Sequence, residues 1–234
     1  MVLLAGSWLY AINWTEWKMD HTITALTAQK KNPRRINVFL DGEFAFGLQR
    51  IVAAWLEVGQ VLSDEKIAQL KDHDQKEIAY QKALHLLSYR LHSEAEIVQK
   101  LQKHDIPEED VESAIDRLKN NNLLDDTKFA EAWVENRKET RPRGRRALAY
   151  ELKRRGINPE TIDETLSELD EGEMAYQAAW KRSQRLTNLD WGDFRLKLTR
   201  FLTQRGFNYD VIPAVITRLW EEIYQIEKFP DEGV

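Results

Sequence analysis

The sequence predicts a mostly α-helical protein, in which tandem three-helix repeats, nine helices in all, form a curved solenoid after a small antiparallel β region. Helical apolar periodicity runs almost unbroken from about residue 74 to residue 228, and the pattern recurs at offsets of 51 and 50 residues. Before it, two apolar runs flank an Asp-Gly pair, which is a strong hairpin signature. With ten glycines and six prolines, the chain has few residues that break helices.

Three windows of the helical region align without gaps, namely Ile97–Leu118, Leu148–Leu169 and Leu198–Leu219. Six columns of this alignment hold an apolar residue in all three windows, as expected for the buried face of a repeated helical unit. The columns are Ile97/Leu148/Leu198, Leu101/Leu152/Leu202, Ile106/Ile157/Phe207, Val111/Ile162/Ile212, Ile115/Leu166/Ile216 and Leu118/Leu169/Leu219.

Each window contains a turn between two helices. Asp105, Gly156 and Gly206 align at a position where a helix C-cap requires a left-handed backbone. The residues that suit the start of the next helix are Pro107, Asn158 and Asn208. Ser93 and Glu96 have the spacing of a capping box at the start of the first window. Each window is therefore predicted to be a helix–turn–helix.

A further helix precedes each window, and these helices lie at about Gln75–Tyr89, Asp126–Lys138 and Glu173–Arg185. We therefore divide the helical region into repeat one (residues 73–124), repeat two (residues 125–170) and repeat three (residues 171–228). One unit cannot bury its apolar stripe alone, so neighbouring units must stack, which is why we expect a curved solenoid.

Residues 22–72 are predicted to form a small β-containing N-terminal domain. The predicted strands are Thr22–Gln29, Ile36–Leu40 and Phe44–Leu48, and the predicted helices are Gln49–Leu56 and Ser63–Leu70. Lys30–Pro33 separates the first strand from the second, and Asp41-Gly42 forms the turn before the third.

Residues 1–21 are expected to form a poorly ordered extension. The apolar run Val2–Ile12 is shorter than the ~20 residues that a membrane-spanning helix needs, and no basic segment precedes it as in a secretory signal. Residues 1–18 are either such an extension or the product of an upstream start site, because Met19 directly precedes the first well-patterned segment.

The composition excludes several classes of site. The chain has no cysteine, so it has no disulfide framework, thiolate nucleophile or cysteine-ligated metal, which fits a cytoplasmic protein. Its five histidines are scattered, and it has no H-E-x-x-H, glycine-rich phosphate loop or G-x-S-x-G motif. We therefore predict no catalytic, cofactor-binding or metal site. The net charge is −5, so any DNA-directed role must rest on a local concentration of Lys and Arg.

Such a concentration occurs in residues 137–155, where nine cations stand against Glu139 and Glu151, a local charge of +7. The segment that follows, residues 158–175, holds seven acidic residues and no basic one. Two interpretations are open: solvated helix faces that balance one another, or a basic stripe that faces a polyanion. On the second interpretation, the predicted partner- or DNA-binding residues are Arg137, Arg141, Arg143, Arg145, Arg146, Lys153, Arg154, Arg155, Arg195, Lys197 and Arg200.

Several motifs resemble the RecX family. They are Ala83-Leu84-x-Leu86-Leu87-Ser88, His92-Ser93-x-x-Glu96, Leu123-Leu124-Asp125-Asp126-x-x-Phe129-Ala130 and Gly144-Arg145-Arg146-Ala147-Leu148-x-x-Glu151-Leu152-x-x-x-Gly156-Ile157. The resemblance covers about Ile78 to Trp220 and is more specific in the first two repeats than in the third. The segment from Ile23 to Leu70 is similar to the β-containing N-terminal region of longer members. Asp105 departs from the pattern, because the other two repeats have glycine there.

The resemblance implies a bacterial cytoplasmic regulator of the RecA recombinase. RecX proteins have tandem three-helix repeats, lie in the helical groove of the RecA filament on single-stranded DNA, and usually restrain its ATPase and strand-exchange activities. Many also bind DNA themselves.

We therefore expect a non-catalytic regulator, monomeric when free, that needs no cofactor and modulates its partner; the resemblance implies inhibition, whereas the residues alone leave inhibition and activation open. Its expected partners are the RecA filament and single-stranded DNA, contacted directly or through the filament, and no membrane. Two alternatives stay open, a helix-turn-helix nucleic-acid-binding transcription regulator and a helical scaffold for another protein.

Overall fold

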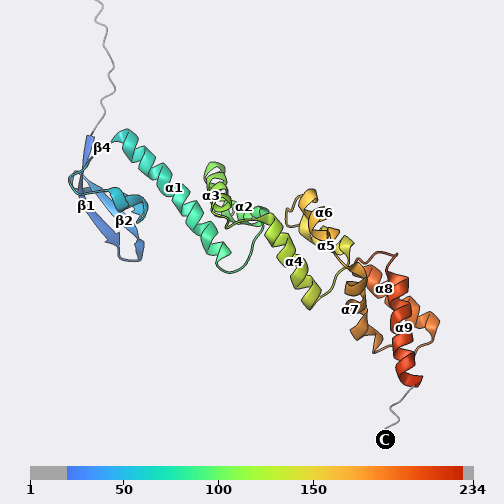
Figure 1. The fold of residues 1–234 in the computed structure, drawn as a ribbon. Coiled ribbons are helices and arrows are strands. Elements are labelled where there is room, and N and C mark those ends of the chain that lie inside the picture. Colours follow the sequence, from blue (N-terminus) through green and yellow to red (C-terminus); the bar gives the residue numbers. More distant parts are fainter. Residues whose placement is uncertain (1–19, 229–234) are drawn as a thin grey trace, which may run out of the picture. The chain divides into compact units, whose positions relative to one another are not determined.

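The computed structural model describes residues 20–228, with side chains as far as Ile223, and this range contains nine α-helices and four β-strands (Figure 1). The chain divides into two compact units, Met1–Ile78 and Ala79–Val234, which we describe separately. The predicted fold class is confirmed, because a small antiparallel sheet precedes three three-helix repeats. No helix among the described residues is both long enough and apolar enough to cross a bilayer.

The N-terminal unit is built on a four-stranded antiparallel sheet with the strand order β3-β2-β1-β4. Its strands are β1 (Asp20–Gln29), β2 (Asn32–Leu40), β3 (Glu43–Gln49) and β4 (Val61–Ser63). The predicted Asp41-Gly42 hairpin is confirmed, since both residues have positive φ angles, 53° and 91°, between β2 and β3.

The first two strands begin earlier than predicted, and β3 is one residue longer at each end. The predicted extension lies outside the described residues except at Asp20 and His21, which instead belong to β1 because they pair with Ser63 and Leu62 of β4. The predicted break at Lys30–Pro33 is only a two-residue turn, after which β2 begins at Asn32. Proline is tolerated there because it lies at the start of the strand.

The helices predicted for this unit also need correction. In place of a helix at Gln49–Leu56, the chain forms only the short 3₁₀ helix η1 (Val52–Trp55), and β4 follows. β4 depends on a non-local pairing with β1, which the local pattern does not reveal. The separate helices predicted at Ser63–Leu70 and Gln75–Tyr89 are one helix, α1 (Asp64–Leu87), because no glycine or proline interrupts it.

The C-terminal unit contains the three repeats, each with a first, a second and a third helix. After the end of α1, its helices are α2 (Glu94–Gln102), α3 (Glu108–Asn120), α4 (Asp126–Thr140), α5 (Arg145–Lys153), α6 (Pro159–Ser167), α7 (Glu171–Ser183), α8 (Trp191–Gln204) and α9 (Ile212–Lys228). The first helices of repeats two and three, α4 and α7, lie within two residues of their predicted bounds.

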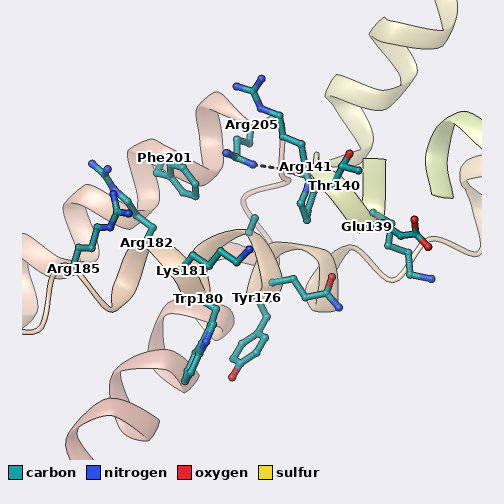
Figure 2. A pocket seen from close by; sticks show the side chains of 14 residues that line it. Glu139, Thr140, Arg141, Tyr176, Trp180, Lys181, Arg182, Arg185, Phe201 and Arg205 are labelled. Carbon is teal, nitrogen blue, oxygen red and sulfur yellow. Dashed lines mark hydrogen bonds between the residues drawn. The ribbon is translucent and has the colours of Figure 1, made fainter. Parts of the chain in front are cut away.

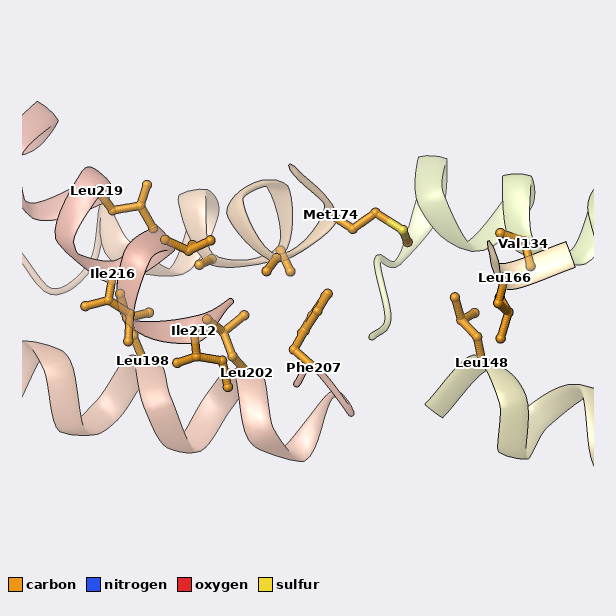
Figure 3. Packing of buried hydrophobic residues seen from close by; sticks show 14 of the residues in the cluster. Val134, Leu148, Leu166, Met174, Leu198, Leu202, Phe207, Ile212, Ile216 and Leu219 are labelled. Carbon is orange, nitrogen blue, oxygen red and sulfur yellow. The ribbon is translucent and has the colours of Figure 1, made fainter. Parts of the chain in front are cut away.

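The repeated apolar columns form the core of this unit. Every residue of the six columns is buried except Ile106 and Leu169, which are half-buried. Repeats two and three share one continuous apolar cluster, whereas repeat one has a cluster of its own. In Figure 3, Met174 and Phe207 lie between Leu148 of repeat two and Leu198 of repeat three. Burial of apolar area therefore holds repeats two and three together.

The turn inside each repeat has the predicted left-handed residue, with φ angles of 56° at Asp105, 81° at Gly156 and 83° at Gly206. Asn158 caps α6 as predicted, because its Oδ1 accepts the Thr161 N–H at 2.7 Å. The N-cap predicted at Asn208 is wrong. α9 begins only at Ile212, and the Asn208 side chain instead donates to Glu171.

Candidate polyanion-binding groove

An open groove of about 650 Å³ lies between repeats two and three. It is lined by the end of α4, the linker from α4 to α5, the second half of α7 and the C-terminal end of α8. Six lining side chains are cationic, and Glu139 is the one carboxylate among the lining residues. The cations are Lys138, Arg141, Lys181, Arg182, Arg185 and Arg205.

The orientation of α7 about its axis places the cations at its C-terminal end in the groove. Asp170 caps the helix by accepting the Glu173 N–H at 2.9 Å, and a buried face that includes Met174 and Ala178 packs on the core. Lys181 and Arg182 are exposed in the last turn of this helix, and Arg185 is exposed two residues after it. Cations there are favoured, because the C-terminal end of a helix carries the negative pole of its dipole.

Phe201 of α8 supports two of the guanidinium groups. The guanidinium carbon of Arg205 lies 4.6 Å from the centre of this ring, and that of Arg182 lies 5.9 Å from it. Arg205 Nη1 also donates to the Pro142 carbonyl at 3.1 Å, which ties the end of α8 to the α4–α5 linker. In Figure 2, Arg141, Arg182 and Arg205 lie on one side of α7, and the rings of Trp180 and Tyr176 point the opposite way.

The charges of the groove are largely uncompensated. Among residues 20–223, no carboxylate lies within 4.0 Å of the side-chain nitrogens of Arg141, Lys181, Arg182, Arg185 or Arg205. Burial lowers the pKa of the Arg205 guanidinium, and the neighbouring cations Arg141 and Arg143 lower it further. The groove is therefore a surface of positive potential that favours an anionic occupant.

Trp180 and Tyr176 have a packing role at the edge of the groove. Their rings stack with centres 5.8 Å apart, and Arg218 of α9 lies over Tyr176 at 3.8 Å. The Tyr176 hydroxyl donates to Glu222 Oε2 at 2.6 Å, and this hydrogen bond raises the pKa of Tyr176. These contacts join α7 to α9.

Three of the predicted binding residues form ion pairs inside the protein. Arg137 Nε donates to Glu151 Oε2 at 2.8 Å, and Arg143 Nε lies 3.7 Å from Glu151 Oε1. Arg155 forms an ion pair with Glu96 of repeat one. A fourth predicted residue, Arg145, donates from Nη2 to the Ser167 carbonyl at 3.4 Å. These contacts stabilise the fold and leave less of each cation for a partner.

The other predicted residues lie on the surface in three places. Arg141 lines the groove. Arg146, Lys153 and Arg154 are exposed on and just after α5. Arg195, Lys197 and Arg200 are exposed on α8 and do not line the groove. Of the eleven predicted binding residues, Arg141 alone lines the groove.

Sequence reasoning missed five of the six groove cations as candidates, namely Lys138, Lys181, Arg182, Arg185 and Arg205. Two signals could have identified them. Lys138, Lys181 and Arg182 lie in the last turns of the first helices of repeats two and three, and Arg185 follows α7 by two residues. Arg205 directly precedes the left-handed Gly206. Both positions are sites where cations approach the free carbonyls of a helix end.

Repeat one has a groove of the opposite charge. A hollow of about 320 Å³ between α2 and α3 is lined by Glu94, Glu108, Glu112 and Asp116 and by no cation. No cluster of three or more His, Asp or Glu residues within the described range could hold a metal ion. The C-terminal unit therefore carries a basic groove and an acidic groove on different repeats.

Four family models match this chain. "RecX, first three-helix domain" matches residues 79–118, "RecX, second three-helix domain" residues 125–166, and "RecX, third three-helix domain" residues 170–216. "Regulatory protein RecX N-terminal domain" matches residues 21–63. The regulatory protein RecX of Bacillus velezensis is 33% identical over 199 residues, which cover 83% of this chain and 76% of that protein. The chain belongs to the RecX family of regulatory proteins.

Further relatives support this membership over most of the chain. The regulatory protein RecX of Clostridioides difficile is 31% identical over 202 residues, covering 84% of the present RecX-family chain and 95% of that protein. A crystal structure of regulatory protein RecX is similar with a TM-score of 0.69 and 31% identity, over 83% of this chain and 98% of that one. The crystal structure of RecX from Lactobacillus salivarius has a TM-score of 0.59 and 27% identity, over 63% and 97%.

Proposed function

We propose that this RecX-family chain is a non-catalytic cytoplasmic regulator that binds the RecA recombinase filament on DNA and lowers its ATPase and strand-exchange activities. The observation that supports a nucleic-acid-directed role is the groove between repeats two and three. It gathers six cations and one carboxylate on a chain whose net charge is −5. Such a local excess of Arg and Lys suits phosphate contact.

The proposed mechanism is selective binding to one state of the filament. A ligand shifts an equilibrium only by its difference in affinity for the two states. Phosphates of filament-bound DNA would meet the exposed cations Arg141, Arg182 and Arg185, while the acidic groove of repeat one would avoid DNA and face protein. Inhibition then follows when the bound state is less competent in ATP hydrolysis or strand exchange.

The alternative of a helix-turn-helix transcription regulator fits the surface charges less well. A recognition helix must place its exposed side chains in the major groove of DNA. The second helix of the window in repeat two, α6, instead exposes three carboxylates and no cation, namely Glu160, Asp163 and Glu164, and its C-cap Glu168 is also exposed. Repulsion by phosphates disfavours insertion of this helix into DNA.

The test of the proposal is a titration of the chain into cognate RecA during DNA-stimulated ATP hydrolysis. We expect the rate to fall at fewer than one regulator per RecA subunit, because one bound chain can hold several neighbouring subunits. Electron microscopy of the same samples confirms that filaments are present. An unchanged rate on intact filaments would contradict the proposal.

A further inference from the structure

Arg155 and Arg205 occupy the same position in repeats two and three, directly before the left-handed glycine of each turn. Arg155 is neutralised, because it forms an ion pair with Glu96 and lies 3.7 Å from the centre of the Trp133 ring. The repeat alignment places Ala147 where Glu96 stands. Arg205 therefore lacks the carboxylate that its counterpart has.

The surroundings of Arg205 offer little compensation for its charge. Arg205 is half-buried, and within residues 20–223 its side chain makes one hydrogen bond, from Nη1 to the Pro142 carbonyl. A guanidinium has five N–H donors, so most of its capacity remains for another acceptor. The charged groups that act on it most are the cations Arg141 and Arg143. A half-buried cation in this setting gains from a bound anion.

We propose that Arg205 and Arg182, both held against Phe201, form a phosphate subsite that Arg141 completes. This inference rests on the proposed function, because it assigns the part of the groove that meets a polyanion. Phosphate oxygens take the place at Arg205 that the Glu96 carboxylate takes at Arg155. The ligand is a tetrahedral phosphate group, supplied either by a nucleic-acid backbone or by a free phosphate compound.

Occupancy of the subsite is coupled to the contact between repeats two and three. Arg205 donates to the carbonyl of Pro142 in the linker, and its own carbonyl accepts the Gly144 N–H at 3.0 Å. A bound phosphate reduces the repulsion among Arg141, Arg143 and Arg205 across this contact. Phosphate binding therefore raises the melting temperature of the protein at constant ionic strength.

The experiment uses the full chain and two probes, sodium pyrophosphate and a short single-stranded oligo-dT, with NaCl keeping the ionic strength constant. NMR resonances of the arginine side-chain Nε–H groups follow binding at each arginine, and calorimetry gives the affinity. The variants are Arg182→Gln and Arg141→Gln. The matched control is Arg195→Gln, which removes the same charge from an exposed site outside the groove.

We expect saturable shifts of the Arg182 and Arg205 resonances with at least one probe. Each groove variant should weaken binding about tenfold and remove the gain in melting temperature, whereas the control changes affinity less than about twofold. Pyrophosphate and oligo-dT binding equally well identifies a free phosphate site, and binding of oligo-dT alone identifies a backbone site. Equal weakening by all three variants, or no saturable binding of either probe, would overturn the subsite.

The test contains no RecA, so its result is independent of the regulatory activity. A chain that inhibits RecA without binding either probe would lose the phosphate subsite and keep its proposed function. A chain that binds phosphate at Arg182 and Arg205 but leaves RecA unchanged would keep the subsite and lose that function.

Discussion

The side-chain contacts between repeats one and two are mainly polar, whereas a continuous apolar cluster runs through the junction between repeats two and three in addition to its polar contacts. At the first junction, Arg155 pairs with Glu96, and the Ser93 hydroxyl donates to the Arg155 carbonyl at 2.6 Å. At the second junction, one apolar cluster continues from α4 to α9. The backbones also approach closely there, because a Cβ atom at Gly144 would lie 2.2 Å from the Gly206 carbonyl oxygen.

One backbone contact is common to both junctions. The N–H of the first residue of the second helix donates to a carboxylate on the first residue of the next repeat's first helix. Glu94 donates to Asp126 at 2.8 Å, and Arg145 donates to Glu171 at 3.0 Å. The same repeat geometry is therefore stabilised by different side-chain chemistry. Among the described side chains, Arg155 of the first junction has a carboxylate partner and Arg205 of the second has none.

The largest expected difference between the junctions comes from Gly144→Ala. A Cβ there would collide with backbone atoms of Gly206 and Phe207 that no side-chain movement can clear. We expect a loss of about 3 kcal/mol in the free energy of unfolding, the upper part of the range for overpacking. At the equivalent N-cap of the first junction, Ser93→Ala should cost about 1 kcal/mol. Urea denaturation measures both.

Gly172→Ala is the control for this comparison, because its Cβ would meet only Asp170 Oδ1, at 3.5 Å. Gly172 lies near the start of α7, so alanine there should be neutral or slightly stabilising. Equal stability of Gly144→Ala and Gly172→Ala would show that the second junction is not closely packed.

The second comparison concerns the two shared carboxylates. Glu171 is buried and accepts the Arg145 N–H, the Asn208 N–H and the Asn208 side-chain amide, at 3.0, 3.0 and 2.8 Å. We expect Glu171→Ala to cost about 2–3 kcal/mol, because buried donors lose a charged acceptor. Asp126 accepts the Glu94 N–H, but burial raises the pKa of Asp126, which means that burial disfavours its charged form. We therefore expect Asp126→Ala to cost only about 1 kcal/mol. Thermal and urea denaturation would contradict this account if the order were reversed.

The third comparison tests whether the first junction is electrostatic. A double-mutant cycle of Glu96→Gln and Arg155→Gln should give a coupling free energy of about 1 kcal/mol, since both side chains are partly exposed. Screening should reduce this coupling as NaCl rises from about 0.05 M to about 0.5 M. The stability loss of Gly144→Ala should not change over this range, because it is steric. A coupling that is insensitive to salt would exclude the ion pair as its source.

The smallest expected effect is a pH dependence beside the first junction. His92 precedes Ser93 and is buried, and burial lowers its pKa despite the nearby carboxylate of Glu96. The unfolded chain therefore binds a proton more readily than the folded chain, so stability falls as pH drops below about 6.5, the ordinary histidine value. His92→Leu should remove this fall, as measured by urea denaturation between about pH 5 and pH 8.

The pKa of His21, in the N-terminal unit, shifts in the opposite direction to that of His92. Its Nδ1 pairs with Asp41 Oδ2 at 2.9 Å, and the hydrogen bond to Asp41 raises the pKa of His21. Its contribution to stability is present at low pH and is lost as pH rises through the folded-state pKa. NMR titration of both imidazoles checks the two directions. Shifts of the same sign would contradict this assignment.

The sequence predicted the repeats well because their signals are local and occur three times. The apolar columns and the left-handed turns at Asp105, Gly156 and Gly206 need only the spacing of residues along one helix pair. β4 and the role of Asn208 could not be predicted this way, since each depends on a distant partner, β1 and Glu171.

The candidate site was harder to predict because charge along the sequence does not show which cations are paired. The strongest basic run, residues 137–155, contains Arg137 and Arg143, which share Glu151, and Arg155, which pairs with Glu96. The groove instead takes Arg182 and Arg205 from a weaker basic run. Ion pairing between residues 8 to 59 positions apart in the sequence neutralises these cations, so the strongest basic run contributes little to the groove.

The central claim is that the groove cations, and not the exposed cations of α8, mediate regulation of RecA. The most direct test compares Arg141→Gln/Arg182→Gln/Arg185→Gln with Arg195→Gln/Lys197→Gln/Arg200→Gln in the DNA-stimulated ATPase assay of cognate RecA. Each triple variant removes three exposed charges. The account predicts that the groove variant loses inhibition and the α8 variant keeps it. Full inhibition by the groove variant, or loss of inhibition only in the α8 variant, would contradict the account.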